Sequence, residues 1–73
     1  MNTWNKSTVR VNCILIQDRP MALLILQDEI EVWIPRSLLE HISKRDNGFL
    51  VELKVDMPEW LAEEKGLDYD CVE

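Results

Sequence analysis

Four stretches of this chain alternate hydrophobic and polar residues in the way that β-strands do. Residues 9–17 are rich in β-branched side chains, and residues 21–27 are apolar on both faces at their centre. Residues 30–34 and 49–56 alternate cleanly, so each has one face that belongs in a core. The side chains predicted to face inward in these last two strands are Ile30, Val32, Ile34, Phe49, Val51, Leu53 and Val55.

Turn and cap residues divide the strands. Residues 18–20 and 28–29 have the composition of turns, which predicts an antiparallel meander of the first three strands. Pro35 ends the third strand, and Ser37 can then cap a short helix, which residues 43–48 follow as a loop. The apolar stripe of this short helix is Leu38, Leu39 and Ile42, and His41 lies on the same helix.

A second helix is predicted to close the chain. Asp56 or Met57 is its expected N-cap, because Pro58 suits the first helical position. Gly66 has the place of a residue that ends a helix with positive φ. The apolar residues expected to pack inward from this segment are Trp60, Leu61 and Leu67.

These elements predict a small α+β fold. A curled antiparallel sheet (the three-strand meander, the short helix and a fourth strand) would cover the C-terminal helix, as in small barrels of the OB or SH3-like kind. An OB fold also needs a fifth strand, which the pattern does not provide. We expect one domain over residues 1–73, with flexible ends at 1–7 and 68–73.

The composition of the chain predicts a reducing cellular compartment and no membrane-spanning segment. The chain has two distant cysteines, Cys13 and Cys71, which are too few for a secreted disulfide scaffold. We therefore expect free thiols in a reducing cytoplasm. No apolar signal segment follows Met1, and residues 21–26, the longest apolar run, are far too short to cross a bilayer. A chain this small would also gain core by forming a homo-oligomer.

The sequence contains no recognisable motif for catalysis or metal binding. His41 is the only histidine, and Ser7, Ser37 and Ser43 lack the glycine-flanked turn of a hydrolase nucleophile. Both glycines occupy turn or cap positions, so no phosphate-binding loop is available. Clustered cysteine and histidine ligands are absent too. The sequence predicts a protein that is not an enzyme and uses no cofactor or metal.

All of the net charge of −6 comes from the last third of the chain. Residues 1–48 balance to zero, whereas residues 49–73 carry eight acids and two lysines. A solvated helix face explains this pattern, but a row of carboxylates can also attract a basic partner. The residues predicted to bind such a partner are Glu59, Glu63, Glu64, Asp68 and Asp70, with Asp56 in the same row.

Trp33 is a further candidate for partner binding. Alternation places it on the face opposite Ile30, Val32 and Ile34, where it is exposed if that face is open and buried if a helix covers it. If exposed, it could instead serve a nucleic-acid site, with bases stacked on the indole and phosphates on nearby cations. The residues of this alternative site are Trp33, Arg36, Lys44 and Arg45.

Two segments resemble a pattern found in small proteins encoded by phages and prophages. They are the strand end Trp-Ile-Pro-Arg-Ser at residues 33–37 and the helix Pro-Glu-Trp-Leu-Ala-Glu-Glu-Lys-Gly-Leu at residues 58–67. With the meander, the resemblance covers roughly residues 9–67. It implies a bacterial host, but it carries no assigned activity and no catalytic residues.

The resemblance and the charge together predict a non-enzymatic phage or mobile-element protein. Its partner would be a basic surface of a nucleic-acid-handling host protein, which it would inhibit as anti-CRISPR proteins do. The alternative is a single-stranded nucleic-acid-binding accessory protein for phage replication or recombination. A self-associating structural protein is the third option, and none of the three needs a membrane.

Overall fold

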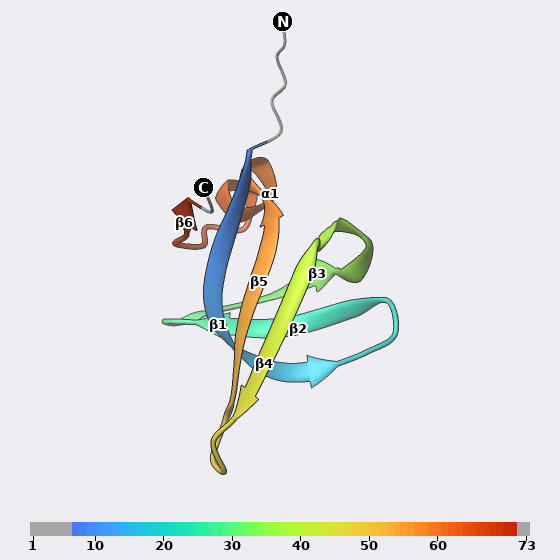
Figure 1. Cartoon of the computed structure of the whole chain (residues 1–73), viewed down its shortest axis with the longest axis vertical. Coiled ribbons are helices and arrows are strands. Elements are labelled where there is room, and N and C mark those ends of the chain that lie inside the picture. Colours follow the sequence, from blue (N-terminus) through green and yellow to red (C-terminus); the bar gives the residue numbers. More distant parts are fainter. Residues whose placement is uncertain (1–6, 72–73) are drawn as a thin grey trace, which may run out of the picture.

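An antiparallel sheet dominates the computed structural model, which describes residues 7–71 (Figure 1). Its strands are β1 (Thr8–Asp18), β2 (Ala22–Gln27), β3 (Ile30–Pro35), β4 (His41–Asp46), β5 (Val51–Pro58) and β6 (Asp70–Cys71). A 3₁₀ turn, η1 (Arg36–Leu38), follows β3, and the α-helix α1 (Glu59–Glu64) follows β5. The strand order is β3-β2-β1-β5-β4, with β6 paired to β1.

β1 organises the sheet because its 11 residues pair with three other strands. Its first half lies between β5 and β6, and its second half pairs with β2. The register with β2 shifts between Leu15 and Gln17, which marks a β-bulge. A bulge bends and twists its strand, and Figure 1 shows β1 curving strongly along its length.

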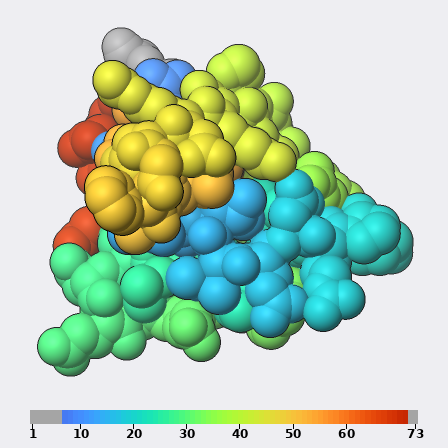
Figure 2. All heavy atoms as spheres, turned by 90° about the horizontal axis from the view of Figure 1, so that it is seen from below, coloured from blue at the N-terminus to red at the C-terminus, as the bar shows by residue number. Residues whose placement is uncertain are grey.

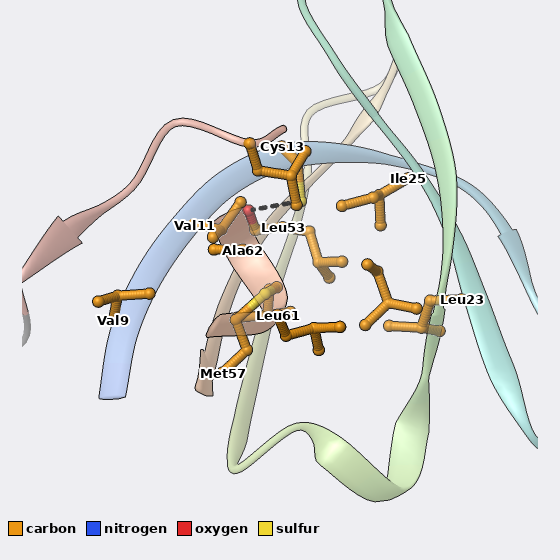
Figure 3. Close-up of a cluster of buried hydrophobic side chains, with 12 residues drawn as sticks. Val9, Val11, Cys13, Leu23, Ile25, Leu53, Met57, Leu61 and Ala62 are labelled. Carbon is orange, nitrogen blue, oxygen red and sulfur yellow. Dashed lines mark hydrogen bonds between the residues drawn. The ribbon is translucent and has the colours of Figure 1, made fainter. Parts of the chain in front are cut away.

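The core lies on one face of this curved sheet, here called the inner face (Figure 3). Alternate residues of β1, β2, β3 and β5 point into it, and α1 adds Leu61 and Ala62. Its buried side chains are Val9, Val11, Cys13, Leu23, Ile25, Ile34, Leu53, Val55, Met57, Leu61, Ala62 and Leu67. The outer face is the opposite side of the same sheet.

The end of α1 follows the prediction from Gly66. This glycine has φ +72°, and its N–H donates to Glu63 O at 3.1 Å. The Leu67 N–H donates to Ala62 O at 2.9 Å, which completes a Schellman motif, and Leu67 is buried as expected. The helix therefore stops after two turns and sends the chain back towards the sheet.

Two strands are absent from the sequence prediction: β4, and β6, which pairs with β1 inside the segment 68–73 predicted to be flexible. Residues 41–46, expected to end a helix and begin a loop, form β4 and pair with β5 from His41 opposite Asp56 to Asp46 opposite Val51. The expected short helix is only η1, whose N-cap is Pro35 and not Ser37. β4 escapes a pattern search because it is a charged edge strand with one partly buried residue, Ile42.

The barrel prediction is wrong, although the antiparallel sheet and the closing helix are confirmed. β3 and β4 lie at the two ends of the strand order and are not hydrogen-bonded to each other, so the sheet stays open. The free side of β4 carries Lys44 and Arg45, and such charges discourage a further strand partner. Residues 1–6 and 72–73, parts of the predicted flexible ends, lie outside the described residues.

Two further predictions near β5 are wrong. Phe49 is 95% exposed because it lies in the β4–β5 turn, where its N–H donates to Asn47 Oδ1, and not in the strand. β5 also runs through Pro58, which pairs with Thr8 and is itself the N-cap of α1. Asp56 and Met57 therefore belong to the strand, and the Glu59 N–H donates to Ser7 O.

Candidate protein-binding site

The exposed side of α1 combines carboxylates with an indole. Leu61 and Ala62 are buried, whereas Trp60 is 55% exposed, so the prediction that Trp60 anchors the core is wrong. The helix has only six residues, and its inward positions are taken by Leu61 and Ala62. Residues four apart share a helix face, which places Glu64 beside Trp60.

Tyr69 ties two of the predicted carboxylates together. Its hydroxyl lies 2.9 Å from Glu63 Oε2 and 2.9 Å from Glu59 Oε2. These hydrogen bonds, with that to Glu63 the stronger influence, raise the pKa of Tyr69 well above its ordinary value. The phenol therefore stays neutral, and its one proton is shared between two carboxylates. The contact fixes α1 against the segment that follows it.

Gln27 fixes the same segment to the sheet. Its Oε1 accepts from the Asp68 N–H at 2.7 Å, and its Nε2 donates to Asp68 O and to Asn12 O, each at 3.0 Å. The amide thus pairs with the backbone of Asp68 as a neighbouring strand would. The Asp68 backbone is held in place while its side chain remains exposed. No sequence signal separates Gln27 from any other polar residue at a strand end.

Five carboxylates lie on α1 and on the segment that follows it, and none of them forms a salt bridge within residues 7–71. We call this set the acidic end: Glu59, Glu63, Glu64, Asp68 and Asp70. Between residues 7 and 71, every Lys or Arg that forms a salt bridge does so with Asp56 or Asp18, and with none of these five. The sequence prediction that they lie outside the core agrees with their exposure, which is partial only for Glu59.

Asp56 does not belong to the acidic end. It is 8% exposed, and its carboxylate accepts from Arg10 Nε at 2.8 Å and from Arg10 Nη2 at 3.2 Å. Hydrogen bonding to Arg10 lowers the pKa of Asp56. Its predicted place in an exposed anionic row is therefore wrong, because Arg10 on the adjacent strand neutralises it.

Trp33 lies on a different surface. It is 45% exposed, so the open-face alternative holds over the covered one. β3 directs Trp33 to the outer face while its neighbour Ile34 is buried in the core on which α1 packs. Trp33 therefore lies on the face opposite α1 and its carboxylates Glu59, Glu63 and Glu64. Asp70 lies at the β1 edge of the sheet, opposite Arg10, on the outer side.

The cations of the alternative nucleic-acid site are divided. Arg36 and Lys44 both form ion pairs with Asp18, with Lys44 Nζ 2.8 Å from Oδ2. These contacts, Lys44 first and then Arg36, lower the pKa of Asp18. Arg45 lies on the outer face, where its register partner is Glu52. Each of the three cations thus has an acid beside it.

Groups for covalent or metal chemistry are sparse. Within residues 7–71 no three Asp, Glu, His or Cys side chains are grouped to hold a metal. Both cysteines are free thiols, as predicted, and burial raises the pKa of Cys13 to about 11, which keeps it protonated. The helices in this range are too short and too polar to span a membrane.

Comparison of the chain with protein-family models, curated proteins and solved structures found no match.

Proposed function

We propose that this chain is a non-enzymatic protein that binds a basic surface of a nucleic-acid-handling protein through the acidic end. The observation that supports this most strongly is the exposure of Trp60 among carboxylates that no described Lys or Arg neutralises. Unpaired charge accelerates encounter with an oppositely charged partner, and an exposed indole supplies a hot spot.

The chemistry of the partner follows from this combination. An arginine can stack on the Trp60 indole while its guanidinium reaches Glu64 one turn along the helix. Arginine-rich surfaces that bind phosphate groups offer such side chains. We therefore infer that the acidic end occupies a groove that otherwise holds nucleic acid.

Rigidity of the acidic end supports the same proposal. Tyr69 joins the segment after α1 to the helix, and Gln27 joins the same segment to the sheet. The Schellman motif fixes the residue at which the segment begins. A surface fixed before binding loses less conformational entropy on association. The carboxylates would meet a partner in one arrangement.

We propose a phage or mobile-element setting in which the protein inhibits a host defence system, in the manner of an anti-CRISPR. This rests on the resemblance of residues 33–37 and 58–67 to phage-encoded proteins and on the charge of the acidic end. An inhibitor of this kind competes with nucleic acid for its target. Competition is therefore the behaviour to measure.

Affinity capture from nuclease-treated bacterial lysate, followed by competition with the partner's nucleic acid, tests the proposal. Trp60→Ala should weaken the captured complex by at least about tenfold, because the central aromatic anchor is lost. Trp33→Ala is the matched control, since it removes a comparably exposed indole from the other face. Equal loss in both variants, or a partner that binds the protein and its nucleic acid together, contradicts the proposal.

The alternative function, binding of single-stranded nucleic acid, has weaker support. Asp18 and Glu52 lie beside the cations that would meet phosphates. A titration with a labelled single-stranded oligonucleotide at low salt separates the two functions. Salt-sensitive binding that Arg45→Ala weakens would favour the alternative over the acidic end.

A further inference from the structure

The outer face of the sheet carries an apolar patch. Register places Leu24 opposite Trp33 and Leu26 opposite Ile14, so all four side chains lie on one face. Leu50, next to β5, continues the patch on the hairpin side. We call Ile14, Leu24, Leu26, Trp33 and Leu50 the outer patch. In the described chain, α1 packs on the inner face; within the outer patch Trp33 and Leu50 are exposed, Ile14 and Leu26 are partly exposed, and Leu24 is buried beneath its neighbours.

A groove of about 590 Å³ crosses this face between the β1–β2 pair and the β4–β5 hairpin. Figure 2 looks onto the tip of that hairpin (yellow to orange), with the second half of β1 and its connection to β2 (blue to cyan) next to it. The apolar part of the groove wall consists of Ile14, Leu26 and Leu50 of the outer patch and of two core residues, Cys13 and Leu53. Its charged lining consists of Lys44, Arg45, Glu52 and Lys54.

The charges around the outer patch are balanced. Lys44 is paired with Asp18, and Arg45 and Lys54 are matched by Glu52 and by Glu31, the register partner of Leu26. Nucleic acid would find no excess of positive charge here, and a basic protein would be drawn to the acidic end. This surface carries both acids and bases. When a second copy of the chain is related to the first by a twofold axis, the acids of each copy can face the bases of the other.

We propose that the outer patch binds a second copy of this chain in a twofold-symmetric dimer. Two such sheet faces can stack with their side chains interdigitated, with the exposed Trp33 on the edge strand β3 as an anchor. The α1 helices lie on the opposite face of each sheet, so the carboxylates of Glu59, Glu63 and Glu64 would be kept apart. Burial of the patch adds core that a 73-residue chain otherwise lacks.

Sedimentation equilibrium from low micromolar to near-millimolar concentration tests this dimer. The wild-type chain should dimerise, and Trp33→Glu should raise the dimer dissociation constant at least about tenfold by introducing a charge at the anchor. Trp60→Glu, with the same change at a comparably exposed indole, should leave it unchanged. Circular dichroism and the Tm establish that each variant is folded.

Three outcomes would overturn the dimer. The first is a wild-type chain that stays monomeric over the whole range, and the second is equal weakening by Trp33→Glu and Trp60→Glu. The third is a monomer that binds a labelled single-stranded oligonucleotide and loses it with Trp33→Glu, which would assign the patch to nucleic acid. The outer patch and the acidic end consist of different residues. A result that excludes the dimer therefore does not exclude partner binding by the acidic end, which the capture experiment tests separately.

Discussion

At the scale of single residues, Gln27 and Tyr69 determine where the carboxylates of the acidic end lie. Gln27 replaces a strand partner for the Asp68 backbone, and Tyr69 holds Glu59 and Glu63 within reach of one hydroxyl. Neither role can be predicted from the sequence, because both depend on a chain reversal that brings residues 10 or 41 positions apart together. The prediction that Trp60 packs inward is wrong for a related reason: Leu61 and Ala62 occupy the inward positions of the six-residue helix.

Gln27→Glu should destabilise the fold by about 1–2 kcal/mol, because a carboxylate cannot donate to Asp68 O and Asn12 O. The change preserves size, so packing is not disturbed. Urea unfolding at neutral pH measures the effect, and faster exchange of the Asp68 amide hydrogen locates it. Gln17→Glu is the control, since Gln17 binds only the exposed Arg19. A Gln27→Glu chain as stable as this control would contradict the assigned role.

At the scale of elements, hydrophobic alternation predicts β1, β2, β3 and β5, and turn chemistry predicts the Gly66 end of α1. β4 and β6 could not be predicted in the same way, because their side chains are mostly exposed and tertiary pairing alone holds them. Asp18 has a comparable long-range role. Its two ion pairs connect the end of β1 to η1 and to β4, across the open side of the sheet.

Asp18→Asn should lower the Tm at neutral pH, because both ion pairs lose their charge. The pKa of Asp18 is lowered in the folded state, so its contribution is present above the unfolded value of about 3.9 and is lost as the pH falls through the folded pKa. The difference in Tm between wild type and Asp18→Asn should therefore shrink below about pH 4. Scanning calorimetry across this range measures it, and a difference independent of pH would contradict the ion pairs.

At the scale of the whole molecule, the sequence predicts the charge asymmetry along the chain. It does not predict where the acidic residues lie on the surface of the fold. The last third of the chain carries the net charge of −6, but Arg10 neutralises Asp56 and Glu52 lies opposite Arg45 on the outer face, so only the five carboxylates of the acidic end lie on α1 and the segment after it. The expected barrel stays open, and Trp33 faces away from α1. The molecule thus presents two unlike surfaces, one anionic with an indole and one apolar with balanced charge.

Charge reversal within the acidic end tests the central claim most directly. Glu64→Lys with Asp68→Lys avoids Glu59 and Glu63, whose contact with Tyr69 would complicate the result. Glu31→Lys with Glu52→Lys is the control, because it changes net charge equally at two exposed acids of the outer face, opposite Leu26 and Arg45. The dissociation constant for the captured partner should rise at least about tenfold for the first pair and stay within about twofold for the control. Equal affinity for the two double variants would contradict the claim that these carboxylates form the binding surface.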